Sequence, residues 1–532
     1  MSRKVLGIDL GTTYSCVAAL DENDRASVQP NQEGDLTTPS VVYIENSGNV
    51  VVGKFAKNEL KNEPERVIAL IKRHMGEEGY TVAVDGKDYY PQQVSAMILQ
   101  QVVEDALAAL GTEKPDSGEL ADVVITVPAY FGAAERQATQ DAGEMAKLNV
   151  LSIINEPTAA AIAYGLMSTG GERSVLVYDL GGGTFDVTII NVSDAEIRVV
   201  ATGGDHRLGG ADWDERLVDL IVEKFQEQVP GQDPRDDLDA AGTIELIAED
   251  AKKALSRRDN YSVAVTAGGA RAKIEILRSE YEAQTADLIG RTLDFTKDVL
   301  DRARDKGLTR IDELLLVGGM SHSPAIKARL VAEFPDLPSP QLADPDQIVA
   351  KGAALFAASR VAETSDPMGS ADSTNGTTES AALPGGRAMP KIVNVTSKGY
   401  GVAVVRDRKK PDGDLRVSWL IRPNDEIPTS PKDTFSTVHD DQETVHVTVY
   451  ESFTDVLSEE LSDNKELVDG DLTGLPGGPA GQPVQMAFNL GQEGILRVTA
   501  TGSNGRELKL EAQISGLIPD EVKRAPLPLL AR

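Results

Sequence analysis

The chain has 532 residues, 41% of them hydrophobic, which is enough for about two to four domains with cores of their own. Its 53 lysine and arginine residues against 84 aspartate and glutamate residues give a net charge of −31, which argues against nucleic acid or an anionic membrane as the main partner. Cys16 is the only cysteine, so no intrachain disulfide can form. Together with the lack of a charged leader and of a long apolar run, this favours a cytoplasmic protein without a membrane segment.

From residue 1 to about residue 360, short apolar runs alternate with longer amphipathic stretches. This alternation predicts an α/β architecture in which helices cover the sheets. Strands that end in turns are expected over 122–128 and 313–317, and α/β folds usually bind ligands at such strand ends. The clearest helices are expected over 92–110, 133–148, 212–228, 244–256 and 285–306.

One short motif occurs twice in this region. Residues 5–13 (VLGIDLGTT) and 175–184 (VLVYDLGGGT) each read as a buried strand that delivers an aspartate, Asp9 or Asp179, to a glycine turn. The glycines let backbone N–H groups approach phosphate oxygens, and the aspartates can face a metal ion. A single copy is commonly just a turn between strands, but two copies predict a nucleotide held between two related lobes.

The composition changes after residue 360. Residues 361–388 are rich in Ser, Thr, Gly, Ala and acidic side chains, which cannot bury enough apolar surface to fold, so a flexible linker is expected. Beyond it, period-two alternation predicts an antiparallel β-sandwich, with a hairpin at Asn504-Gly505, a pair that tolerates positive φ at both positions. After residue 517 no long helical domain is expected. The alternating segments are 391–405, 415–421, 444–450, 484–489, 495–501 and 507–513.

Further motifs complete the first half in a recognisable order: Lys72-Arg73, 127–131 before Arg136, 154–161, 203–205 before 208–210, and 317–319. Taken together, they resemble the ATPase domain of the seventy-kilodalton heat-shock chaperones of the DnaK type, which share the actin and sugar-kinase fold. The resemblance covers about residues 3–358. It continues in the second half, where 425–429, 433–437, 444–447 and 493–500 look like the β-sandwich with which the family binds extended peptides.

The resemblance implies an α/β fold with an actin-like, two-lobed ATPase domain over 1–360, built from a duplicated ribonuclease H-like fold. An interdomain linker over 361–390, a peptide-binding β-sandwich over 391–517 and a tail over 518–532 would follow. The implied function is an ATP-dependent chaperone that binds apolar segments of unfolded proteins and hydrolyses ATP to ADP and phosphate. Its cofactors would be ATP or ADP, Mg²⁺ and K⁺, and its partners a J-domain co-chaperone and a nucleotide exchange factor.

The same resemblance assigns roles to single residues. Asp9 and Asp179 would orient the water shell of Mg²⁺, which prefers to keep waters and takes few carboxylates. Lys72 would neutralise charge on the γ-phosphoryl group, while Glu156, Asp186 and Thr12 would position the attacking water or the ions nearby. The catalytic set would be Lys72, Glu156, Asp179, Asp186 and Thr184. The nucleotide-binding positions would be Asp9, Gly11, Thr12, Thr13, Tyr14, Gly181, Gly182, Gly183, Thr184, Gly209, Gly210, Glu249, Lys252, Lys253, Ser256, Gly318, Gly319, His322 and Asp346.

Two departures from the family pattern suggest weaker function. Lys253 and His322 stand where the family usually has arginines that sandwich the adenine, and lysine stacks less well, so weaker nucleotide affinity is expected. The interdomain segment 390–395 has a run of two consecutive apolar residues, Ile392 and Val393, instead of a fuller run, and Asn394 replaces an acidic residue, so weaker coupling between domains is expected. The positions that match the family's interdomain relay, Pro128 and Arg136, are present.

The peptide groove would be formed by Tyr400, Val402, Val405, Phe435, Val438 and Val445, although ordinary core packing explains apolar strand residues equally well. A Lys-rich insertion at 406–414 lies beside this groove. The family's helical lid has no counterpart, so fast peptide exchange is expected.

An alternative function is a nucleotide-switched scaffold or regulatory protein of the same fold with one dedicated partner. The missing lid and altered linker favour that alternative, and the intact carboxylates and Lys72 favour the chaperone. A small-molecule kinase would not carry the second half.

Overall fold

The computed structural model describes residues 3–113, 118–167, 171–342, 344–365, 389–407, 410, 413–454, 456–491, 494–511 and 518–531. Most of the predicted linker, 361–390, and part of the insertion at 406–414 lie outside these ranges. Within the ranges, no helix is both long enough and apolar enough to cross a membrane.

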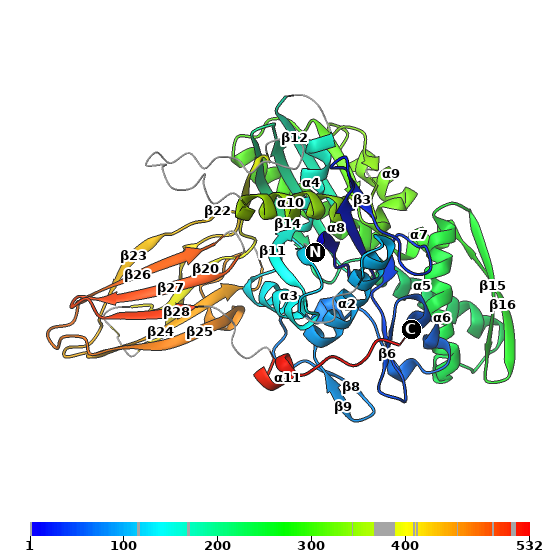
Figure 1. Cartoon of the computed structure of the whole chain (residues 1–532), viewed down its shortest axis with the longest axis horizontal. Helices are drawn as coiled ribbons and strands as arrows, with labels where there is room; N and C mark the ends of the chain where they lie inside the picture. The colour runs from blue at the N-terminus through cyan, green and yellow to red at the C-terminus, as the bar shows by residue number, and fades with distance from the viewer. Residues whose placement is uncertain are drawn as a thin grey trace.

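Two sheets with the same strand pattern form the first two thirds of the chain (Figure 1). In the first, β1 (Val5–Asp9) is antiparallel to β2 (Tyr14–Leu20) and parallel to β10 (Asp122–Val127). In the second, β12 (Arg173–Leu180) is antiparallel to β13 (Phe185–Val192) and parallel to β17 (Glu313–Val317). The repeated motif therefore forms equivalent central strands, and the expected two-lobed α/β fold is confirmed. The two sheets also contain β3 (Ala26–Val28), β4 (Thr38–Pro39), β11 (Asn149–Asn155), β14 (Glu196–Asp205), β18 (Gln341–Leu342), β19 (Lys391–Val395) and β22 (Glu426–Ile427).

Helices pack closely between and around the two sheets. A Cβ atom at Gly7 of β1 would lie 2.0 Å from the backbone N of Ala354 in α10, and one at Gly352 would lie 1.8 Å from the carbonyl O of Ala159 in α4. Glycine at these two positions therefore lets α10 pack directly on β1 and on α4. The long helices are α2 (Pro91–Ala109), α3 (Ala133–Met145), α4 (Glu156–Met167), α5 (Gly210–Gln228), α6 (Leu238–Leu255), α8 (Ala286–Asp305) and α10 (Ile348–Ser365).

Shorter elements complete the two lobes. In the first lobe they are α1 (Lys54–Asn58), β5 (Val42–Ile44), β6 (Val50–Val52), β7 (Val67–Ile68), β8 (Val82–Val84) and β9 (Lys87–Tyr89). In the second they are the hairpin of β15 (Asn260–Ala267) and β16 (Ala270–Leu277), together with α7 (Arg278–Gln284) and α9 (Pro324–Glu333).

A β-sandwich follows, and its two antiparallel four-stranded sheets enclose a core that includes Val449, Phe488 and Leu496. One sheet has the order β21 (Leu415–Ile421), β20 (Tyr400–Val405), β24 (Thr444–Ser452), β25 (Asn464–Thr473), and the other β23 (Lys432–Ser436), β26 (Pro483–Leu490), β27 (Leu496–Gly502), β28 (Glu507–Glu511). The predicted hairpin joins β27 to β28. However, positive φ occurs at Gly505 and not at Asn504, because the loop closes through a bond from the Gly502 N–H to the Arg506 carbonyl, with one glycine in the left-handed region.

The alternating run 391–405 does not form a single strand. β19 pairs in parallel with β14 of the second lobe, and β20 enters the sandwich. Between them, the Thr396 N–H donates to the Asp425 carbonyl and the Gly399 N–H donates to the Ser452 hydroxyl, which redirects the chain. As a result the sandwich lies against the ATPase-like lobes, on the side of α3 and β14 (Figure 1).

Candidate functional site

A cavity of about 760 Å³ lies between the two lobes, and both copies of the repeated motif line it. Asp9 and Asp179 end their strands at this cavity, as the repeated motif requires. Three predicted residues, Gly183, Asp186 and Gly209, are not among its lining. The predicted positions that do line it are Asp9, Gly11, Thr12, Thr13, Tyr14, Lys72, Glu156, Asp179, Gly181, Gly182, Thr184, Gly210, Glu249, Lys252, Lys253, Ser256, Gly318, Gly319, His322 and Asp346.

The two glycine turns face each other across the cavity. A Cβ atom at Gly182 would lie 1.8 Å from the Thr13 hydroxyl oxygen, and one at Gly183 would lie 2.3 Å from a methyl carbon of Thr12. A Cβ at Gly209 would lie 2.5 Å from the backbone of Gly183 and Thr184. Any larger residue at these positions would therefore push the turns apart. The second turn is closed by a bond from the Gly181 N–H to the Thr184 carbonyl at 3.0 Å, and glycine turns of this kind let backbone N–H groups approach an anion.

Four carboxylates and one lysine gather where the turns meet. Lys72 is buried and its Nζ lies 2.7 Å from Glu156 Oε1. Burial, and then repulsion from Glu156, raises the pKa of Asp9 to about 7. Burial also raises the pKa values of Asp179 and Asp186, again with repulsion from Glu156. Lys72 therefore offsets only part of the burial and mutual repulsion that disfavour the charged forms of these acids.

The carboxylate cluster fits a hard cation. Asp186 Oδ1 is buried and has no hydrogen-bond partner among the described residues, so a polar group is expected to approach it. In the part of the chain that is described, no three acidic, histidine or cysteine side chains are arranged as direct metal ligands. Magnesium retains most of its waters in phosphate sites, so carboxylates that act through the water shell suit it.

Lys72 and Arg73 are adjacent in a 3₁₀ turn but contact different partners. The Nζ of Lys72 lies 5.7 Å from the centre of the Phe131 ring, which limits its freedom. Arg73 donates to the carbonyl of Gly183 at 3.0 Å and to Asp212 at 2.6 Å. Arg73 therefore fastens the second glycine turn to the start of α5. The sequence motif Lys72-Arg73 contains this residue, but the resemblance implies no role for it.

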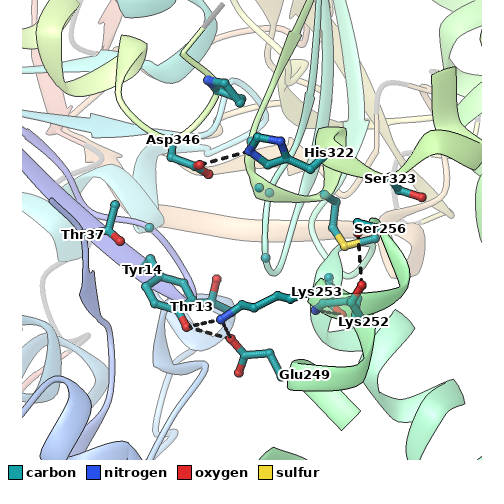
Figure 2. A pocket seen from close by; sticks show the side chains of 18 of the residues that line it. Thr13, Tyr14, Thr37, Glu249, Lys252, Lys253, Ser256, His322, Ser323 and Asp346 are labelled. Carbon is teal, nitrogen blue, oxygen red and sulfur yellow. Dashed lines mark hydrogen bonds and ion pairs between the residues drawn. The ribbon is translucent and has the colours of Figure 1, made fainter. Parts of the chain in front are cut away.

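The end of the cavity that is predicted to hold the nucleoside is organised around Tyr14 and Glu249 (Figure 2). The Tyr14 hydroxyl donates to Glu249 at 2.7 Å, and Lys253 Nζ donates to the Tyr14 oxygen at 2.9 Å. Lys57, from α1 of the first lobe, forms an ion pair with Glu249 on α6 of the second lobe. Burial opposes the charge of Glu249, but Lys57 and Lys253 hold its pKa at about 2. Lys57 thus links the two lobes through its ion pair with Glu249. No sequence motif pointed to this contact.

The remaining predicted residues at this end are held by partners of their own. Lys252 contacts Asp214 at 2.6 Å and the carbonyl of Gly210 at 2.9 Å. Burial raises the pKa of Asp214 to about 6 despite Lys252. On the opposite wall, His322 Nε2 lies 3.2 Å from Asp346 (Figure 2). Asp214 was not predicted, and no local motif points to it.

The predicted relay residues lie where the ATPase-like lobes contact the sandwich. Arg136 donates to the Phe131 carbonyl at 3.0 Å and also bonds to Asn155. A Cβ atom at Gly494 of the sandwich would lie 2.7 Å from Arg136 Cδ. The Phe131 N–H donates to the carbonyl of Pro128 at 3.2 Å. Pro128 and Arg136 therefore flank the loop that carries Phe131 to Lys72.

A buried acid from the sandwich meets the beginning of α3. Glu451 of β24 is 3% exposed, and its Oε1 lies 3.4 Å from the backbone N of Ala133. Burial raises the pKa of Glu451, with repulsion from Glu135 as the second cause. Negative groups at a helix N-terminus are favourable, so this contact holds the sandwich to α3.

The predicted groove residues occupy two environments. Tyr400 and Val402 are buried in the sandwich core, and Phe435 and Val445 are partly buried against that core. Val405 and Val438 are also partly exposed. The groove assignment of these residues stays a prediction.

Comparisons with known proteins match nearly the whole chain. The family model described as Hsp70 protein matches residues 5–368 and 410–524. The chain is 38% identical over 508 residues to the chaperone protein DnaK of Halobacterium salinarum, covering 94% of this chain and 73% of that protein. It is 39% identical over 530 residues to the chaperone protein DnaK of Thermotoga maritima, covering 98% of this chain and 82% of that protein.

Proposed function

The chain belongs to the Hsp70 protein family, and from this premise we propose that the cavity between the lobes is its site of ATP hydrolysis. The protein is an ATP-dependent molecular chaperone of the DnaK type. It binds exposed apolar segments of unfolded proteins and hydrolyses ATP to ADP and phosphate. The scaffold alternative is not favoured, because the relatives that cover most of the chain are named as chaperones.

The observation that carries the proposed site is the carboxylate cluster beside two facing glycine turns. The backbone amides of 11–14 and 181–184 would hold the phosphates, and Asp9 and Asp179 would hold the water shell of Mg²⁺. When bound, the ion supplies neutralisation of phosphate charge. Burial and mutual repulsion raise the pKa values of Asp9, Asp179 and Asp186, so bound cations would stabilise their ionised forms, and we propose K⁺ as a second cation beside Mg²⁺.

Lys72 is positioned for the transition state. Its ammonium would lie beside the γ-phosphoryl oxygens, where it offsets the charge that develops as the bond to the leaving group breaks. Glu156 holds that ammonium with one carboxylate oxygen, and its other oxygen and Asp186 are available to orient the attacking water. Thr184, at the second turn, lies near the same phosphate. No covalent intermediate on the protein is needed for this chemistry.

The proposal also covers domains and partners. The ATPase domain would comprise 1–360, the linker 361–390, the peptide-binding sandwich 391–517 and the tail 518–532. The ion pair between Lys57 and Glu249 joins the two lobes, and it would break if the lobes opened to release ADP, which supports a nucleotide exchange factor as a partner. A J-domain co-chaperone would couple hydrolysis to client binding.

Substitution of Lys72 tests the proposed site. Lys72→Ala is expected to lower single-turnover ATP hydrolysis by about 10²–10³-fold, because one preorganised positive group at the transition state is lost. The exposed Lys54→Ala is the matched control and is expected to hydrolyse at the wild-type rate. Unfolded protein and a J-domain partner are expected to stimulate the wild type. Undiminished hydrolysis by Lys72→Ala would overturn the assignment.

A further inference from the structure

The last described segment, residues 518–531, leaves the sandwich and runs along the first lobe (Figure 1). We call it the C-terminal strap. Ile518 is 6% exposed and belongs to the core of the first lobe. Val522, Leu527 and Leu530 pack against the same core. Four apolar side chains along the strap thus contact the ATPase domain and not the sandwich from which the strap emerges.

The end of the strap adds a strand to the first lobe. Leu530 forms a parallel bridge with Val50. The Val50 N–H donates to the Leu529 carbonyl at 2.9 Å, and the Ala531 N–H donates to the Val50 carbonyl at 2.7 Å. Since β6 is the edge strand of a three-stranded sheet, the strap satisfies backbone groups that an edge would otherwise leave open.

The short helix α11 (Asp520–Arg524) fixes the strap to α3. Lys523 Nζ lies 2.6 Å from Asp141 and 2.9 Å from Glu144, both on α3. At the N-terminus of α3, the backbone N of Ala133 contacts Glu451 of the sandwich. Helix α3 is therefore held at its beginning by the sandwich and near its end by the strap.

We propose that the C-terminal strap is an intramolecular tether that keeps the sandwich docked on the ATPase domain. Six residues, 512–517, separate β28 from Ile518. A connection of this length spans at most about 25 Å when fully extended. While the strap stays bound to the first lobe, the sandwich cannot move far from α3 and β14, and its effective concentration at the docking surface stays high.

The strap acts alongside the strand β19, which joins the sandwich to the second lobe. The sandwich is thus tethered to both lobes, by β19 on one side and by the strap on the other. Release of the strap would free the tether to the first lobe and leave β19 as the tether to the second lobe. The strap therefore sets how readily the sandwich leaves the ATPase domain.

Matched pairs of variants test this tether in the full chain. Leu530→Asp places a charge against the core of the first lobe, whereas Leu529→Asp changes the neighbouring side chain, which is 76% exposed. Lys523→Glu reverses the charge that faces Asp141 and Glu144, whereas Arg524→Glu changes a side chain that is 82% exposed. Hydrogen–deuterium exchange would report on peptides that contain Val50, β19 and the beginning of α3.

Leu530→Asp and Lys523→Glu are expected to raise the rate of hydrogen–deuterium exchange at Val50. They are also expected to raise the exchange rates at β19 and Ala133 by about ten-fold or more. Both control variants are expected to exchange at the wild-type rates. Faster exchange at Val50 with unchanged exchange at β19 would overturn the proposal, because the sandwich would then stay docked without the strap. Equal exchange rates for the two variants of each pair would overturn the proposal as well. If Leu530→Asp unfolds the first lobe, Lys523→Glu, a partly exposed position, decides the question.

Discussion

The raised pKa of Asp9 is evidence that its site suits a bound cation. Asp9 lies at the end of β1, accepts a hydrogen bond from Thr126 at 3.2 Å, and is surrounded by other acids. Its pKa of about 7 reflects burial first and repulsion from Glu156 second. A bound cation would remove both penalties, so the site is electrostatically costly without one.

The pH dependence of the free energy of unfolding tests the raised pKa of Asp9. The pKa of Asp9 is raised from 3.8 to about 7 in the folded state, so between these values the folded protein binds more protons than the unfolded chain. The free energy of unfolding is therefore expected to fall as pH rises from about 4 to about 7 in the absence of magnesium nucleotide. Asp9→Asn should flatten this dependence, as measured by urea unfolding at a series of pH values. A wild-type stability that rises over this interval would contradict the account.

The sequence revealed some site residues and not others for a physical reason. Asp9 and Asp179 adjoin glycine turns, so a local pattern identifies them. Lys57 acts only because α1 is placed across the cavity from Glu249, 192 residues away along the chain. Asp214 likewise matters through Lys252, 38 residues away. No local pattern encodes such partners.

At the scale of elements, buried apolar side chains hold the interdomain strand β19. Val393 is buried, and Val395 and Met389 belong to one core. Asn394, in place of an acidic residue, accepts a hydrogen bond from Thr158 at 3.0 Å. Each buried aliphatic side chain contributes roughly 1.5–3 kcal/mol to docking of the strand. The weaker coupling expected for this segment stays a prediction, because burial here depends on pairing with β14 and not on alternation alone.

A single added methyl group tests the contact between β24 and α3. A Cβ at Gly132 would lie 2.3 Å from Glu451 Oε1, and the φ of −81° at this position is one that alanine adopts readily. Gly132→Ala is therefore expected to displace the sandwich without straining the ATPase domain. Small-angle scattering should show a larger radius of gyration.

The matched control for Gly132→Ala is Gly290→Ala, because a Cβ at Gly290 in α8 would have no neighbour within 4 Å. This variant is expected to scatter like the wild type. An unchanged radius of gyration for Gly132→Ala would mean that the contact between Glu451 and α3 does not hold the sandwich.

At the scale of the whole molecule, the duplicated strand pattern places two glycine turns, which we propose bind phosphate, at one cavity. Alternation and the repeated motif predicted the two lobes and the sandwich, because periodicity and turn chemistry are local properties. The way in which the sandwich and the strap lie on the lobes was not predictable. It depends on contacts such as Lys523 with Asp141, which are 382 residues apart.

The central claim is that the two facing turns bind one magnesium nucleotide through Asp9 and Asp179. Calorimetric titration of the full chain with ATP tests it most directly. The account predicts uptake of one nucleotide per chain that is strengthened by Mg²⁺, and a loss of the magnesium effect in Asp179→Asn. Failure to detect ATP uptake with magnesium present, or a magnesium effect that Asp179→Asn leaves intact, would contradict the account.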